Sequence, residues 1–139
     1  MRFWDSSALI PLVVRQPASP RVDLWFAEGF SLAIWTLTST EIASALWRLV
    51  REGALSEADA HRAEFRAEEL AAASHTVADL EAVKPIARRL LRVHALRAAD
   101  ALQLGAALVW AVGQPQGKTV HTLDDRLAVA ARREGFDVP

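Results

Sequence analysis

The chain has 139 residues, 52% of them hydrophobic, which predicts a single domain over residues 1–139 with a sizeable core. It contains no cysteine, which excludes disulfides and thiolate metal sites and fits a reducing, cytoplasmic setting. The formal net charge of −1 excludes a strong overall attraction to nucleic acid, so any such binding depends on local basic clusters.

Short runs of bulky or β-branched residues alternate with segments of helical periodicity along the whole chain. In chain order they predict a strand at 2–4, helices at 6–15 and 21–29, a strand at 31–35, helices at 38–53 and 56–73, a strand at 75–79, helices at 80–96 and 97–113, a strand at 118–123, a helix at 124–135 and an edge strand at 136–139. Strands that alternate with helices are typical of parallel sheets. We therefore expect an α/β fold: a three-layer α/β/α domain with a mainly parallel, four- to five-stranded sheet.

Four acidic residues lie at or near the start of a predicted helix, and each has a purely structural explanation. They are Asp5, Glu41, Asp100 and Asp124. Asp5 or Ser6 caps the first helix, and Asp124 caps the last. Thr38 and Glu41 have the spacing of a capping box, and Asp100 favours the positive end of its helix dipole. Taken singly, each acid is better explained as a helix cap than as a ligand.

Taken together, the four acids indicate a metal site. Ligands of open parallel sheets bind at the edge where strands lead into helices, and Asp5 and Asp124 fall directly there. Converging carboxylates repel one another, and a divalent cation relieves that repulsion. Oxygen ligands without cysteine favour Mg²⁺ or Mn²⁺, and the four histidines are too scattered to compete.

Such a site is well suited to the hydrolysis of phosphodiesters, because the cation activates water and offsets charge on the phosphate oxygens. We expect Asp5 and Asp100 to be the inner ligands and Glu41 and Asp124 to hold metal-bound waters or a second ion. Ser7 and Thr122 are predicted to orient those waters through hydrogen bonds.

Four stretches of the chain resemble the four acidic motifs of the PIN-domain family, and most of all its short members, the VapC toxins. The stretches are FWDSSALIPLV, TSTEIASALWR, LRAADALQLGAAL and HTLDDRLAVAARREGF. They occur in the family's order and span the chain, so the resemblance implies a single PIN domain over residues 1–139. Gln103 and Gly105 stand where other residues are common in the family.

The resemblance implies a Mg²⁺- or Mn²⁺-dependent endoribonuclease that stops growth by cutting RNA. The family's acids, which are both catalytic and metal-binding, carry over to Asp5, Glu41, Asp100 and Asp124. Its hydroxyl positions carry over to Ser6 or Ser7 and to Thr122. Family members usually form homodimers and are held inactive by a small antitoxin, in toxin–antitoxin hetero-oligomers.

Several further residues are candidates for contacts with partners. Arg97 and Arg126 flank the acids in sequence and are our candidates for binding the RNA backbone, whereas most other arginines fit solvated helix faces. Trp47 lies on a helix with abundant charge, and we hypothesise that it lines a groove for the antitoxin. No membrane span is expected, because no apolar stretch reaches roughly 18 residues, and no signal peptide is recognisable.

Three other functions remain open at this point. The first is a PIN-domain nuclease for RNA processing that has no antitoxin. The second is a receiver-like Mg²⁺-binding signalling domain, which would need a paired acid beside Asp5 and a lysine after a late strand. The third is a non-catalytic binding domain that uses the acids only as caps.

Overall fold

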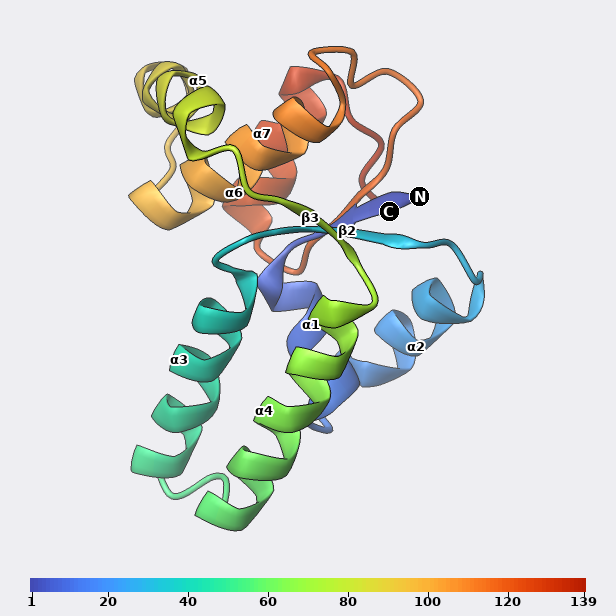
Figure 1. Cartoon of the computed structure of the whole chain (residues 1–139), viewed down its shortest axis with the longest axis vertical. Helices are drawn as coiled ribbons and strands as arrows, with labels where there is room; N and C mark the ends of the chain where they lie inside the picture. Colours follow the sequence, from blue (N-terminus) through green and yellow to red (C-terminus); the bar gives the residue numbers. More distant parts are fainter.

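A four-stranded, wholly parallel sheet organises the computed structural model, which describes all residues 1–139. The strands are β1 (Arg2–Trp4), β2 (Leu32–Trp35), β3 (His75–Val77) and β4 (Val120–His121), in the order β3-β2-β1-β4. Figure 1 shows the sheet edge-on between two layers of helices. This arrangement confirms the predicted three-layer α/β/α fold.

Seven helices cover the two faces of the sheet. No helix combines the length and the hydrophobicity that a membrane span needs. The helices are α1 (Ser6–Val13), α2 (Ser19–Ala27), α3 (Thr38–Arg51), α4 (Glu57–Ala72), α5 (Leu80–Val93), α6 (Ala98–Trp110) and α7 (Asp125–Glu134). Helices α1 to α4 lie on one side of the sheet and α5 to α7 on the other (Figure 1). Each face therefore has its own hydrophobic core.

Alternation along the short strands divides the side chains between the two cores. On β1, Phe3 packs into the 18-residue core under α5, α6 and α7, while its neighbour Trp4 packs into the 12-residue core with α1 to α4. On β2, Trp35 and Ile34 divide in the same way. Since neither face of the central strands meets water, these strands read as continuous apolar runs.

Small residues bring α5 and α6 close together. A Cβ atom added at Gly105 would lie 3.2 Å from Val83 Cγ1 and 3.4 Å from the Val83 carbonyl oxygen. A contact at 3.2 Å is tighter than nine in ten real Cβ contacts, so a larger residue here would require Val83 to shift by a few tenths of an ångström. The packing of α6 is thus the structural reason for Gly105.

The predicted elements differ from the structure mainly at their ends. The expected edge strand at 136–139 is reduced to one bridge between Thr119 and Asp137. Helix α2 begins at Ser19, with Pro20 in its first turn, rather than at residue 21. Each difference involves backbone hydrogen bonding that side-chain periodicity does not report.

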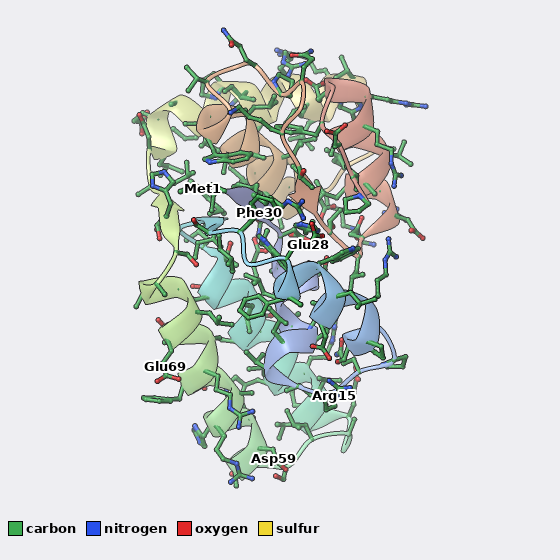
Figure 2. All side chains as sticks on the ribbon, turned by 90° about the vertical axis from the view of Figure 1, so that its right-hand side faces the viewer. Met1, Arg15, Glu28, Phe30, Asp59 and Glu69 are labelled. Carbon is green, nitrogen blue, oxygen red and sulfur yellow. The ribbon has the colours of Figure 1, made fainter.

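His121 on β4 is a structural histidine, since its side chain is fully buried between two tryptophan rings. The ring centroids of Trp4 and Trp25 lie 4.4 and 4.8 Å from that of His121. Burial, together with the nearby positive charge of Arg2, lowers the pKa of His121 to about 4. Arg2 in turn pairs with Glu28 and lies over the ring of Phe30. Figure 2 labels Glu28 and Phe30 near the N-terminal residue Met1. His121 is therefore neutral at pH 7.

The lowered pKa of His121 predicts that the fold loses stability in mild acid. Between pH 6.5 and about 4 the unfolded chain takes up a proton at this ring, whereas the folded chain does not. The free energy of unfolding should then fall by about 1.4 kcal/mol per pH unit, or about 2 kcal/mol between pH 6.5 and 5. Urea unfolding at several pH values measures this slope. The raised pKa values of Asp5 and Glu41 add a contribution of the opposite sign in every variant, so the slope of the wild type minus that of His121→Gln isolates the histidine. The exposed control His75→Gln should keep the wild-type slope, and an unchanged slope in His121→Gln would contradict the assignment.

Candidate active site

Asp5 directly follows β1 and is buried, with only 4% of its surface exposed. It caps α1 by accepting a hydrogen bond from the Ser7 backbone N–H at 3.2 Å. The same carboxylate oxygen, Oδ2, also accepts hydrogen bonds from Ser7 Oγ at 2.5 Å and Thr122 Oγ1 at 2.9 Å. Its other oxygen, Oδ1, has only a long contact with Ser6 Oγ, at 3.4 Å, because the single hydroxyl hydrogen of Ser6 goes to the closer Glu41 Oε2 at 2.8 Å. One oxygen of Asp5 is thus fixed by three donors.

Ser7 and Thr122 tie the loop after β4 to the start of α1. Ser7 Oγ accepts from the Leu123 backbone N–H at 2.9 Å, and Thr122 Oγ1 accepts from the Asp124 backbone N–H at 3.1 Å. Both hydroxyls donate their hydrogen to Asp5, so either can orient a metal-bound water only by accepting a hydrogen bond from it. In this structure they hold the carboxylate and the loop, and their role toward bound water stays a prediction.

Glu41 does not form the capping box that its spacing with Thr38 indicated, so that prediction was wrong. Leu37 occupies the N-cap of α3 without a side-chain hydrogen bond, and Thr38 is already helical. The Glu41 carboxylate turns toward α1 and α6, where its Oε2 accepts from Ser6 Oγ and from Gln103 Nε2, each at 2.8 Å. Of the four acids, Glu41 is the one whose position has no helix-capping explanation.

Burial and mutual repulsion make the ionised state of these acids costly. Burial raises the pKa of Asp5, against the opposing hydrogen bonds of Ser7 and Thr122. Burial also raises the pKa of Glu41, and the negative charges of Asp5 and Asp100 raise it further. Glu41 therefore lies close enough to Asp5 and Asp100 to feel the charge of both, and a cation there would relieve this repulsion.

Asp100 and Asp124 share a cavity of about 460 Å³ with the two arginines that the sequence singled out. The cavity is lined by Arg97, Asp100, Leu123, Asp124, Asp125 and Arg126. Both acids also cap helices: Asp100 accepts from the Arg97 backbone N–H at 3.1 Å, and Asp124 accepts from the Leu127 backbone N–H at 2.8 Å. Capping uses one oxygen of each carboxylate, which leaves the other oxygen available.

The four acids converge less tightly than the sequence indicated. No three His, Cys, Asp or Glu side chains surround one point closely enough to hold an ion between them. This arrangement still fits Mg²⁺, which keeps several waters and is commonly bound by only one or two carboxylates. The donor set is made only of oxygens, and the acids carry unrelieved negative charge. We conclude that the residues suit a hydrated divalent cation better than a fully dehydrated one.

Sequence reasoning noted Gln103 only as a departure from the family pattern and missed its hydrogen bond to Glu41. Gln103 lies on α6, is only 2% exposed, and joins Glu41 to the helix that carries Asp100. The available signal was a long polar side chain among the small apolar residues of α6. Such a residue needs a partner when it is buried, and the partner could not be named without the fold.

Trp47 lies on α3, partly buried against the core with α1 to α4 and edge-on to the His61 ring, with 5.0 Å between ring centroids. It is not enclosed, yet it lines none of the five main cavities.

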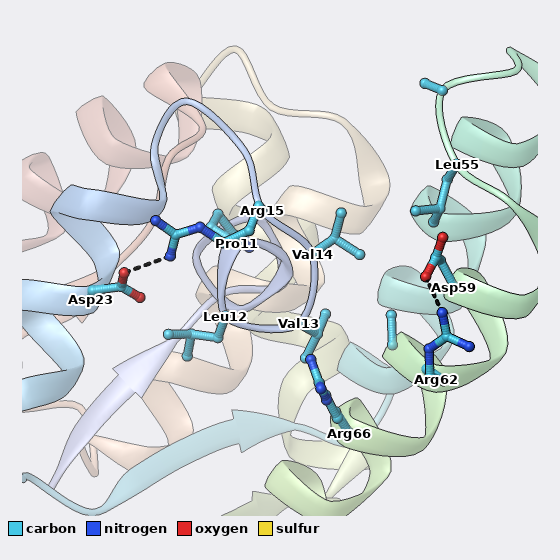
Figure 3. A pocket seen from close by; sticks show the side chains of 12 residues that line it. Pro11, Leu12, Val13, Val14, Arg15, Asp23, Leu55, Asp59, Arg62 and Arg66 are labelled. Atoms are coloured by element: carbon cyan, nitrogen blue, oxygen red, sulfur yellow. Dashed lines mark hydrogen bonds and ion pairs between the residues drawn. The ribbon is translucent and has the colours of Figure 1, made fainter.

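A separate cavity of about 380 Å³ lies between α1, α2 and α4, where Arg15 pairs with Asp23 and Arg62 with Asp59 (Figure 3). None of the four acids lines this cavity.

Comparisons with solved structures support the fold. FitAcB from Neisseria gonorrhoeae aligns with a TM-score of 0.67 and 19% identity, over 99% of this chain and 96% of the other. PAE2754 from Pyrobaculum aerophilum aligns with a TM-score of 0.63 and 24% identity, over 99% of this chain and 87% of the other. At these identities the similarity shows a common PIN-like fold and no more.

Comparisons of sequence identify the family. No family model matches the chain. It is 35% identical over 138 residues to Ribonuclease VapC45 and also to Ribonuclease VapC49, from two strains of Mycobacterium tuberculosis. Each alignment covers 98% of this chain and 92% of the relative, so the similarity extends over the whole domain. The buried acid after β1, the parallel sheet and this similarity together show that the chain belongs to the VapC ribonuclease family of PIN-domain proteins.

Proposed function

We propose that this chain is a Mg²⁺- or Mn²⁺-dependent endoribonuclease, a single PIN domain over residues 1–139 that acts in the cytoplasm as the toxin of a toxin–antitoxin pair. The observation that carries the proposal is that the buried carboxylate of Asp5 and the half-buried carboxylate of Glu41 meet around Ser6, with Gln103 joining Glu41 to the helix that carries Asp100. A buried acid cluster is costly to a fold unless a ligand uses it. The similarity to two ribonucleases supports RNA as the substrate.

In the proposed mechanism Asp5 and Asp100 would hold the ion, and Glu41 and Asp124 would accept hydrogen bonds from water beside it or help to hold a second ion. When bound, the ion supplies an activated water and offsets negative charge on the phosphate. Ser7 and Thr122 fix Asp5 by donating to its Oδ2, and Ser6 fixes Glu41 by donating to its Oε2. The protein thereby presents the remaining carboxylate oxygens without reorganisation.

Arg97 and Arg126 are the proposed contacts for the RNA backbone. Both side chains are exposed and line the cavity that also contains Asp100 and Asp124. A guanidinium there can pair with phosphate oxygens in a bidentate manner and counter the repulsion between RNA and the acids. The acids and the arginines therefore have complementary roles on one surface.

The proposed partners are a small antitoxin and a second copy of this chain. Membership of the VapC family supports both, because the resemblance implies homodimers inhibited by antitoxins. Trp47 remains our proposed antitoxin contact, since its ring is only partly covered by the protein's own core.

Changing Asp100 to Asn should lower the rate of RNA cleavage by roughly a hundredfold or more, while the protein stays folded. The amide keeps a cap acceptor for the Arg97 N–H but loses the charge that a cation needs. A matched control exists in Asp79, which caps α5 by accepting from the Ala82 N–H at 2.9 Å and lies outside the acid cluster. Cleavage of labelled RNA by the purified variants measures the effect. Equal activity of Asp100→Asn and Asp79→Asn would reject the assigned role.

Mg²⁺ or Mn²⁺ should stabilise the fold, because an ion that binds only the folded protein shifts the unfolding equilibrium. At one hundred times the dissociation constant the gain is about 2.7 kcal/mol, and excess chelator should remove it together with activity. Glu41→Gln should reduce the gain, whereas Glu69→Gln on the exposed surface of α4 should keep it. Thermal unfolding with and without ion tests this. RNA cleavage that persists in excess chelator would refute metal dependence.

Arg126→Ala and Arg97→Ala should weaken RNA binding and flatten its salt dependence, since each removes about one phosphate contact. We expect KM to rise and kcat to change little. The control is Arg88→Ala, which removes an exposed arginine of α5 that does not line the cavity. Binding of catalytically silent Asp100→Asn protein to RNA over a range of salt concentrations gives the slope. Identical slopes for Arg126→Ala and Arg88→Ala would exclude Arg126 from the RNA surface.

A further inference from the structure

Gln103 is a buried amide in a helix that is otherwise made of small and apolar residues. Its side chain is 2% exposed, and Nε2 donates to Glu41 Oε2 at 2.8 Å and to Thr38 Oγ1 at 3.3 Å. Its amide oxygen Oε1 is buried and has no hydrogen-bond partner. An amide buried with one unsatisfied oxygen is a cost to the fold. The hydrogen bond from Nε2 to Glu41 is the feature that points to a functional reason for keeping this amide.

The two oxygens of Glu41 have different surroundings. Oε2 accepts two hydrogen bonds, from Ser6 Oγ on α1 and from Gln103 Nε2 on α6. Oε1 makes no hydrogen bond within the protein and is not among the buried atoms that lack a partner. A carboxylate oxygen with two donors has both lone pairs occupied. Only Oε1 is then left to bind a ligand from outside.

Gln103 also sets the position of Glu41 relative to Asp100. The two residues of α6 are three positions apart, so they lie on the same face of the helix. The amide bond therefore ties the carboxylate of α3 to the helix that carries the second acid. Without the hydrogen bond from Gln103, Ser6 would be the single donor left to hold the Glu41 side chain.

We propose that Gln103 is a positioning residue for the metal site: its buried amide holds Oε2 of Glu41 so that Oε1 faces a hydrated divalent cation. This inference rests on the proposed function, because it assigns Gln103 a role in the cation site described there. Partners that orient a ligand in this way typically contribute 10–100-fold to metal affinity. Gln103 touches neither the cation nor the RNA, and acts only through Glu41.

The test is the dissociation constant for Mn²⁺ alone, measured by electron paramagnetic resonance on the purified full chain without RNA. Gln103→Met keeps the length of the side chain and removes the donor, and it should weaken Mn²⁺ binding by roughly tenfold or more. In a Glu41→Gln background the same change should have no further effect, because the carboxylate that it positions is gone. Thr38→Val removes the other acceptor of Nε2 without touching Glu41, and it should bind Mn²⁺ like the wild type.

A second variant covers the case in which Gln103→Met does not fold. Gln103→Asn keeps the amide but shortens the side chain by one methylene group, so it should also weaken Mn²⁺ binding. Wild-type affinity in whichever variant folds, or an equal loss in the wild-type and Glu41→Gln backgrounds, would overturn the role of Gln103 while leaving the metal site intact. Failure of the wild-type protein to bind Mn²⁺ would overturn both this inference and the proposed metal dependence.

Discussion

The structure depends on keeping one carboxylate, that of Asp5, buried at the end of the central strand β1. Its Oδ2 atom accepts three hydrogen bonds, from the backbone and hydroxyl of Ser7 and from the hydroxyl of Thr122. These donors come from α1 and from the loop after β4, so the same bonds that hold the acid also join two segments that are far apart in sequence. Burial still raises the pKa of Asp5 despite them. The three hydrogen bonds therefore offset only part of the free-energy cost of burying the Asp5 carboxylate.

Helix capping and ligand binding are compatible roles for the acids of this site. Asp5, Asp100 and Asp124 each accept hydrogen bonds from backbone N–H groups at helix starts, as the structural explanation required. A cap uses one carboxylate oxygen, and the second oxygen can face the cavity at the edge of the sheet. Helix N-termini also carry partial positive charge, which lowers the cost of gathering acids there. A capping acid is thus already placed and oriented where a cation site requires it.

The fold class, and the position of the four acids at or near helix starts, could be predicted from the sequence, because alternating strands and helices restrict the topology and place strand ends at one edge. What the sequence could not supply was the pairing of side chains across elements. The spacing of Thr38 and Glu41 indicated a local capping box, but tertiary contacts with Ser6 and Gln103 prevailed. The packing of the His121 ring against Trp4 and Trp25 was not predicted either, because it depends on how β4 and α2 lie against β1. Both differences arise from contacts between residues far apart in the chain.

The most direct measurement of the central claim is an anomalous difference map from crystals of this protein soaked in Mn²⁺. The account predicts a peak at the carboxyl end of β1, with Asp5 Oδ1 and an oxygen of Asp100 within bonding distance and Glu41 Oε1 directed at the ion or its waters. A map with no peak there at saturating Mn²⁺, or with the free oxygens of Asp5 and Asp100 pointing away from each other, would contradict it.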